Sequence, residues 1–294
     1  MKPAPFAYHR AESVDHALSL LHGLGDDAKL LAGGQSLAPM LNLRVARPAH
    51  LIDLNDLVEL DSVRRADDWI EIGGMTRHQR VATDPVITGA CPVLSAAAAS
   101  IGHYAIRQRG TLGGSLSHAD PAAQLPLIAT LLNARIEVVS QGGTRTVAAR
   151  DFFVASLSTA LAPGEMVTAV HFPMTPPRTG WGFELFSLRR GDFAVTSVAA
   201  LVTLAPGGEV ERMSLALGGM ATTPLAFDDV TLPHLGRLPD TAWLADIAGT
   251  VTERTAPDGD VRIPAHYRKD LAASLIVRAL AGAVDRAQGR VAHA

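Results

Sequence analysis

The spacing of apolar residues predicts short helices and strands that alternate along the first part of the chain. Ser13 is a suitable N-cap, and four apolar residues after it fall on one face of a helix that ends in glycines: Val14, Ala17, Leu18 and Leu21. The runs AKLLAGG, HLIDL and WIEIGGMT are short, aliphatic and stopped by glycine or polar residues, as buried strands are. This part of the chain therefore mixes helices and strands.

A proline cluster predicts a domain boundary in the second half of the chain. Before it, RIEVVSQGGTRTVAARDFF predicts two strands joined by a turn at Gly142-Gly143, and MVTAVHFP predicts a further strand. The segment PMTPPRTG, residues 173–180, then places three prolines within five residues, and proline is poorly tolerated inside helices and central strands. We expect one domain over residues 1–175 and a second over residues 176–294.

The second domain has a pattern of strands followed by helices. GWGFELFSLRR, VTSVAALVTLA and RMSLALGGM predict three consecutive strands, with a Pro206-Gly207-Gly208 turn between the last two. DTAWLADIAGTVTERTAP and HYRKDLAASLIVRALAGAVDRAQ are helical, and the second has an aliphatic stripe opposite its arginines. An antiparallel meander with segregated helices indicates an α+β fold.

Composition and charge narrow the function classes. The 294 residues carry a net charge of −3, which gives no electrostatic attraction to nucleic acid or anionic membranes. No apolar run reaches the roughly 20 residues of a membrane span, and the N-terminus lacks the apolar core of a signal peptide. We expect a soluble, cytoplasmic protein. Because Cys91 is the single cysteine, the chain has no internal disulfide and no cysteine cluster for zinc or iron–sulfur.

Two glycine segments with similar sequences, AGGQSL and LGGSL, are the strongest candidates for a binding site. In each, closely spaced backbone N–H groups without a neighbouring Cβ would allow an anion to approach, and a serine hydroxyl could donate a further hydrogen bond. Together the segments could hold one diphosphate from two sides. Neither matches the G-x-G-x-x-G or the Walker pattern, and each taken alone is equally a tight turn.

Five motifs in the same order extend over nearly the whole chain: LLAGGQSLAPMLNLRVARPAHLIDLNDL, IEIGGMTRH, IGHYAIRQRGTLGGSLSHADPAAQLP, LRRGDFA and YRKDLAASLIVRAL. With these motifs the chain resembles the FAD-binding medium subunits of the xanthine dehydrogenase and carbon monoxide dehydrogenase family. The resemblance implies two α+β subdomains of the vanillyl-alcohol oxidase and cresol methylhydroxylase type, at about residues 1–56 and 57–175. It also implies a C-terminal domain in which helices pack on a three-stranded antiparallel sheet.

The resemblance implies FAD as the cofactor of the two glycine segments. The residues it assigns to FAD binding are Ala32, Gly33, Gly34, Gln35, Ser36, Leu37, Thr111, Gly113, Gly114, Ser115 and Asp120. Many relatives have histidine at the position of Gln35, although glutamine keeps a donor. Asp120 has an alternative role, because Asp120-Pro121 ahead of an apolar run is typical of an N-cap followed by a proline at the first helical position.

Other residues of the motifs have weaker assignments. His118 is a candidate for lining the cofactor cleft, and Arg107 and Arg109 are expected to anchor the loop to nearby carboxylates or to steer phosphate. We expect the LRRGDFA segment, with Arg189, Arg190, Asp192 and Phe193, where the C-terminal domain meets the flavin, unless it is an ordinary exposed turn. Leu185 stands near the place where many relatives have a lysine that reaches the cofactor. Cys91, ahead of Pro92, is expected to be buried rather than redox-active.

Three functions remain open at this point. The first is the flavin subunit of a molybdenum hydroxylase, whose FAD takes electrons from [2Fe-2S] clusters and passes them to an external acceptor. For this function the resemblance implies a small partner subunit with two [2Fe-2S] clusters and a large one with a molybdopterin cofactor, in a dimer of heterotrimers. The others are a stand-alone FAD oxidase or reductase and a non-catalytic nucleotide-binding assembly protein. We assign no catalytic residue and no metal ligand to this chain.

Overall fold

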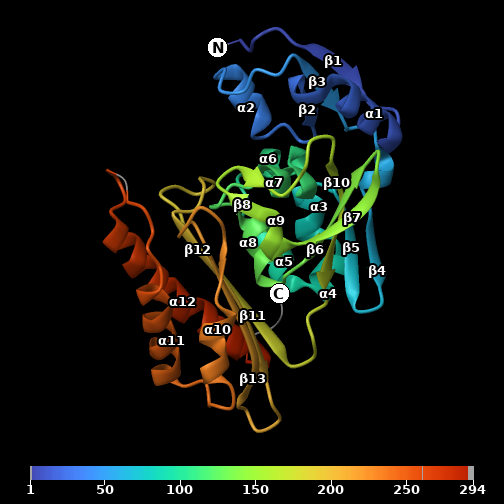
Figure 1. The fold of residues 1–294 in the computed structure, drawn as a ribbon. Coiled ribbons are helices and arrows are strands. Elements are labelled where there is room, and N and C mark those ends of the chain that lie inside the picture. Colours follow the sequence, from blue (N-terminus) through green and yellow to red (C-terminus); the bar gives the residue numbers. More distant parts are fainter. Residues whose placement is uncertain (1, 260, 291–294) are drawn as a thin grey trace.

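The computed structural model describes residues 2–259 and 261–290, which form three parts along the sequence, each built on its own sheet (Figure 1). The outermost limits of the two expected domains, residues 1 and 294, lie outside the described residues. The mixture of helices with a parallel and two larger antiparallel sheets confirms the predicted α+β class.

The N-terminal part is a small parallel sheet covered by one helix. Its strands are β1 (Ala7–Arg10), β2 (Ala28–Leu31) and β3 (His50–Asp53), in the order β1-β3-β2. Helix α1 (Val14–Leu24) begins where the sequence predicts, because Ser13 Oγ accepts a hydrogen bond from His16 N at 3.1 Å. Helix α2 (Leu37–Asn42) lies between β2 and β3, and short 3-10 helices occupy Gly25–Asp27 and Val58–Leu60.

The middle part contains a five-stranded antiparallel sheet, in the order β4-β5-β10-β6-β7. The strands are β4 (Val63–Ala66), β5 (Trp69–Gly73), β6 (Arg135–Ser140), β7 (Gly143–Ala148) and β10 (Met166–Pro173). The turn between β6 and β7 is one residue away from its predicted position. Ser140 pairs with Gly143, so that Gln141 and Gly142 form the turn and Gly143, at φ +120°, already starts β7.

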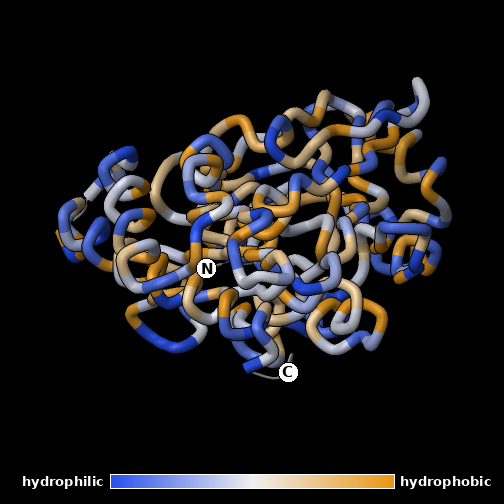
Figure 2. Tube along the Cα trace, turned by 90° about the horizontal axis from the view of Figure 1, so that it is seen from below, coloured by the Kyte–Doolittle hydropathy of each residue, from blue (hydrophilic) through white to orange (hydrophobic). Residues whose placement is uncertain are grey.

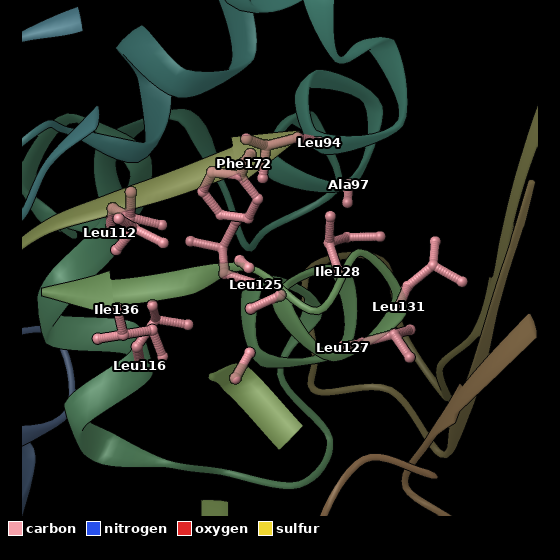
Figure 3. Packing of buried hydrophobic residues seen from close by; sticks show 14 of the residues in the cluster. Leu94, Ala97, Leu112, Leu116, Leu125, Leu127, Ile128, Leu131, Ile136 and Phe172 are labelled. Atoms are coloured by element: carbon pink, nitrogen blue, oxygen red, sulfur yellow. The ribbon is translucent and has the colours of Figure 1, made fainter. Parts of the chain in front are cut away.

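Seven helices and a two-stranded ribbon accompany this sheet in the described residues. They are α3 (His78–Thr83), α4 (Pro85–Ala90), α5 (Pro92–Ala99), α6 (Tyr104–Arg109), α7 (Leu112–His118), α8 (Gln124–Leu131), α9 (Ala149–Phe152), β8 (Phe153–Ala155) and β9 (Ser158–Thr159). Leucines of α5, α7 and α8 form a core with Ile136 of β6 and Phe172 of β10 (Figure 3). Burying one such side chain stabilises the fold by about 1.5–3 kcal/mol.

The C-terminal part is the predicted meander. Strands β11 (Thr179–Phe186), β12 (Thr196–Leu204) and β13 (Val210–Gly218) pair antiparallel in sequence order, and the two-residue β14 (Leu225–Ala226) adds a fourth strand. The helices here are α10 (Asp228–Thr231), α11 (Thr241–Glu253) and α12 (Ala265–Ala287), with a 3-10 helix at Leu232–His234. The predicted pair of long helices is thus confirmed.

Both faces of the C-terminal sheet are buried. Gly180 and Gly182 of β11 let α12 lie directly on the strand, since a Cβ at either glycine would overlap a carbonyl oxygen of Ala283 or Ala279. Val198 of β12 belongs to the core beneath α12, whereas its neighbour Ala199 belongs to the core of the middle part. The division at residues 175 and 176 stays a prediction, because one core continues across it.

Most of the buried residues are apolar. Figure 2 shows hydrophilic and hydrophobic residues in alternation along the peripheral helices, as amphipathic packing requires. Among the helices of the described residues, none has the length and apolar character needed to cross a membrane.

Candidate functional site

The first glycine segment, from Ala32 to Leu37, joins the end of β2 to the start of α2. Gly34 has φ +68°, a left-handed conformation that favours glycine, and its carbonyl accepts a hydrogen bond from Ala38 N at 2.9 Å. Within the described parts of the chain, the backbone N–H groups of residues 33–36 donate to no protein acceptor. These four consecutive amides therefore have no hydrogen-bond acceptor among the described residues, and a run of such amides can bind an anion. The side chain of Gln35 is partly engaged, because its Nε2 donates to Gly33 O at 2.9 Å.

The second glycine segment, from Thr111 to Ser115, is the start of helix α7 and not an open loop. Thr111 is its N-cap and accepts a hydrogen bond from Gly114 N through Oγ1 at 3.2 Å. Gly113 N donates to Gly74 O at 2.8 Å, and Ser115 N donates to Thr111 O at 3.0 Å. The expectation of free backbone donors in this segment is therefore wrong, because acceptors in the helix and at Gly74, just after β5, use them.

The two segments lie side by side although about 80 residues separate them in sequence. A Cβ at Gly33 would overlap Arg109 O and would lie 2.8 Å from Gly110 Cα. A Cβ at Gly114 would lie 3.6 Å from Ala32 Cβ. Figure 1 shows α6 and α7 at the edge of the middle part that faces the N-terminal sheet. The structure thus places four free amides next to the surface formed by α7.

A hydrogen-bonded pair, Asn55 and Arg77, connects the first segment to the end of α6. Asn55 Nδ2 donates to Ala32 O at 3.0 Å, and Arg77 Nη2 donates to Asn55 Oδ1 at 2.7 Å. The other terminal nitrogen of Arg77, Nη1, donates to Arg109 O at 2.6 Å. Neither residue was predicted to have a role, although both stand in the sequence motifs, Asn55 in LIDLNDL and Arg77 in GGMTRH. Their spacing of 22 residues carries no periodic signal.

His78 supports the second segment from inside the molecule. Only 7% of this residue is exposed, and Nε2 lies 2.8 Å from Thr111 O, which makes Nε2 the protonated nitrogen. Its backbone N–H donates to Gly110 O at 2.8 Å, whereas Nδ1 is buried without a partner among the described residues. Burial lowers the pKa of His78 to about 4, so the ring is neutral at physiological pH.

Asp120 and His118 follow α7 at its C-terminal end. Asp120 does not cap the next helix, as its alternative role predicted, because α8 begins only at Gln124. Instead, Asp120 Oδ1 accepts a hydrogen bond from Ala122 N at 2.8 Å in a turn of its own. His118 is the last residue of α7 and is half-buried. Its predicted place in the cofactor cleft stays a prediction.

The two arginines of α6 behave differently from the expectation. Arg107 donates to Gln79 Oε1 at 3.0 Å and to the carbonyl of Ile101 at 3.0 Å, and neither acceptor is a carboxylate. Arg109 is exposed, and its side chain makes no ion pair within the described residues. The expected anchoring to carboxylates is therefore wrong. The backbone of Arg109 lies against Gly33, and its side chain is exposed.

The LRRGDFA segment joins β11 to β12 and lies against the start of α6. A Cβ at Gly191 would be 2.7 Å from the ring of His103, which precedes α6. Phe193 is 61% exposed, and Arg189, Arg190 and Asp192 are exposed as well. The C-terminal part thus reaches the helix that also contacts Gly33, while the predicted contact of Phe193 with a flavin stays a prediction.

Cys91 and Arg268 have structural roles. Cys91 is fully buried, and burial raises the pKa of its thiol to about 12, which confirms the expectation of a buried cysteine. Arg268 of α12 donates to the carbonyls of Val195 and Gly219, and so fixes the start of that helix against two ends of the sheet.

Two cavities lie away from the glycine segments. They have volumes of about 380 and 250 Å³, and Arg150 lines both of them at the junction of the middle part with the C-terminal sheet. No residue of either glycine segment lines them. Shape alone would place a ligand at this junction, whereas the free hydrogen-bond donors are at Gly33 to Ser36. The donors mark the candidate site, because a diphosphate is bound through hydrogen-bond donors.

Known proteins resemble this chain over its full length. It matches the family models described as FAD binding domain in molybdopterin dehydrogenase, over residues 4–175, and CO dehydrogenase flavoprotein C-terminal domain, over residues 181–283. It is 38% identical to the 6-hydroxypseudooxynicotine dehydrogenase complex subunit alpha of Paenarthrobacter nicotinovorans, over 98% of this chain and 97% of that protein. It is 34% identical to the carbon monoxide dehydrogenase medium chain of Afipia carboxidovorans, over 99% of both chains.

The solved structures agree with these matches. A carbon monoxide dehydrogenase structure from Hydrogenophaga pseudoflava superimposes with a TM-score of 0.94 at 34% identity, over 97% of this chain and 99% of that chain. Both family models together extend over most of the sequence. The chain therefore belongs to the FAD-binding medium subunits of the xanthine dehydrogenase and carbon monoxide dehydrogenase family, the molybdenum hydroxylases, and it is an FAD-containing subunit of an oxidoreductase, as its motifs predicted.

Proposed function

We propose that this chain relays electrons within a molybdenum hydroxylase: its FAD takes electrons from [2Fe-2S] clusters on a partner subunit and passes them to an external acceptor. The observation that carries the proposal is the full-length match to medium chains, joined to the four free amides beside α7. When bound, FAD supplies the ability to exchange electrons singly or in pairs. The protein's own contribution is to bind and orient the cofactor.

The first glycine segment would hold the FAD diphosphate. The free N–H groups of residues 33–36 would donate to phosphate oxygens, and the left-handed turn at Gly34 presents them in succession. Residues of the second segment would complete the site. The N–H groups of Gly113 and Gly114 would not donate to FAD, because they already have acceptors within the protein. The proposed binding residues are Ala32, Gly33, Gly34, Gln35, Ser36, Leu37, Thr111, Gly113, Gly114, Ser115 and Asp120.

The small side chains of both segments suit a close approach by the cofactor. Ala32 and Gly114, which face each other, present at most a methyl group, and Gly33 has no side chain. Hydroxyl groups of Ser36 and Ser115 make no hydrogen bond within the described residues, so both could donate to the diphosphate. The residues present therefore fit the group that the family model names.

The substrate would be oxidised on another chain. The relatives reported above are named for a nicotine derivative and for carbon monoxide, yet their flavin subunits resemble this chain at similar identity. This similarity favours a shared function of the flavin subunits in electron transfer, which does not depend on the substrate of the complex. We propose an iron–sulfur small subunit and a molybdopterin large subunit as partners, in a cytoplasmic dimer of heterotrimers.

Anaerobic reduction of the flavin tests whether substrate oxidation takes place on a partner subunit and not on this chain. The isolated chain, loaded with FAD, should be bleached by dithionite and reoxidised by an acceptor, but candidate substrates of the complex should leave it oxidised. The complex purified from its host, with iron and molybdenum measured, should be bleached by its substrate. Substrate-driven bleaching of the isolated chain would favour a stand-alone enzyme, and a chain that never binds FAD would favour an assembly protein.

A further inference from the structure

We infer that Asn55 and Arg77 are a positioning pair, which holds the first glycine segment at a fixed distance from the end of α6 and thereby sets the affinity for FAD. The inference rests on the proposed function, because it assumes that the free amides of residues 33–36 bind the diphosphate. Neither residue is placed in contact with the cofactor. Their effect would pass through the backbone that they hold.

The pair bridges the gap between the N-terminal and middle parts by three successive hydrogen bonds. Asn55 Nδ2 donates to Ala32 O (3.0 Å), and Arg77 Nη2 donates to Asn55 Oδ1 (2.7 Å). Arg77 Nη1 then donates to Arg109 O (2.6 Å). Ala32 directly precedes the four free amides, and Arg109 O is the atom against which Gly33 packs. The bridge therefore begins and ends beside the contact between Gly33 and Arg109.

Both members of the pair are themselves held in place. Asp53 at the end of β3 accepts a hydrogen bond from Asn55 N at 3.0 Å, and Asn55 Nδ2 and Tyr8 also donate to this carboxylate. Burial opposes ionisation of Asp53, but these hydrogen bonds outweigh it and lower its pKa, which keeps the acceptor charged. On the other side, the backbone of Arg77 forms an antiparallel bridge with Thr111, the N-cap of α7.

The guanidinium group suits this bridge better than an ammonium group does. Its two terminal nitrogens reach two acceptors on different segments, which the single ammonium group of lysine cannot do with the same geometry. Burial, and after it the neighbouring Arg109, lowers the pKa of Arg77. An arginine remains charged despite such a shift.

Titration of the full chain, freed of flavin, with FAD tests the inference through the quenching of flavin fluorescence. Arg77→Met and Asn55→Ala should each raise the Kd for FAD by about tenfold or more. The Kd of the double variant should not exceed the higher Kd of the two single variants, because both changes break the same bridge. Arg77→Lys should not restore the affinity, because it keeps the charge and loses the fork. Full restoration by lysine would show that charge matters and would overturn the positioning role.

Arg145→Met is the matched control. Arg145 also bridges two acceptors, Ala160 O at 2.8 Å and Glu165, but lies in β7, outside both glycine segments. It should leave the Kd unchanged, and thermal unfolding without FAD should show whether each variant is folded. Because Asn55→Ala removes only a partly buried amide, it stays informative if Arg77→Met unfolds. Wild-type affinity in both pair variants would overturn the inference, whereas a wild-type chain that does not bind FAD would overturn the proposed function.

Discussion

Gly33 packs against the peptide of Arg109, and the contact leaves no room for a side chain. An added Cβ would overlap Arg109 O and lie 2.8 Å from both the carbonyl carbon of Arg109 and Gly110 Cα. These atoms belong to backbone, which cannot rotate away as a side chain does. The N-terminal and middle parts therefore meet through backbone at the point where the candidate site lies.

Gly33→Ala should separate the two segments and weaken FAD binding by about tenfold or more, because the backbone must shift to admit the methyl group. Equilibrium titration with FAD measures the effect. Gly23→Ala in α1 is the control, since a Cβ there meets no atom within 4 Å. Equal affinity in both variants would mean that the contact at Gly33 has no part in cofactor binding.

Gly34→Val should lower the flavin content of the purified protein sharply. At φ +68° a branched residue is strained by about 1–2 kcal/mol, and relaxing the strain would turn the free amides away from one another. Gly236→Val offers a matched comparison, because Gly236 has φ +74° and open space around it but lies in the C-terminal part. Both variants should lose similar stability, and only Gly34→Val should lose flavin. If both variants lost flavin, the loss would be a consequence of lower stability and not of a change at the binding site.

Gly182→Ala should destabilise the C-terminal part by about 3 kcal/mol, because the methyl group would push α12 away from β11. Gly249→Ala in α11 should act in the opposite direction and stabilise by about 0.5–1 kcal/mol, since the added Cβ meets no atom within 4 Å and alanine is the better helix former. Urea unfolding measures both. A neutral Gly182→Ala would contradict the close helix–strand contact.

His78 should make the folded state sensitive to acid. Its folded pKa of about 4 lies below the usual 6.5, so the unfolded chain binds the proton first as the pH falls. Its contribution to stability is therefore complete above pH 6.5 and is lost as the pH falls toward 4, by about 3 kcal/mol in total. Unfolding free energies measured between pH 7 and 4 should fall less steeply for His78→Leu than for the wild type.

Cys91 should be unreactive toward thiol reagents in the native protein. Its thiol is fully buried and its raised pKa of about 12 keeps it protonated. Labelling with a chromogenic disulfide should therefore report no thiol until denaturant is added, and one thiol per chain afterwards. Rapid labelling of the folded protein would contradict the burial.

The sequence by itself determined the elements whose signals are local. The helix after Ser13 follows from a cap and a one-sided apolar stripe, and the strands β10 to β13 follow from apolar runs between turn residues. The motifs also determined the family and its cofactor, because a resemblance over the full length needs no knowledge of contacts. The two glycine segments were found in the same way.

Only the tertiary structure decided how those segments are used. Gly33 and Gly113 look equivalent in sequence, but Gly113 N donates to Gly74 O, a partner about 40 residues away, and the amide of Gly33 donates to none in the described chain. Likewise, Asn55 and Arg77 become a pair only when the N-terminal sheet packs beside α6. Whether a backbone donor is free depends on which distant acceptor reaches it, and this is a property of packing and not of local sequence.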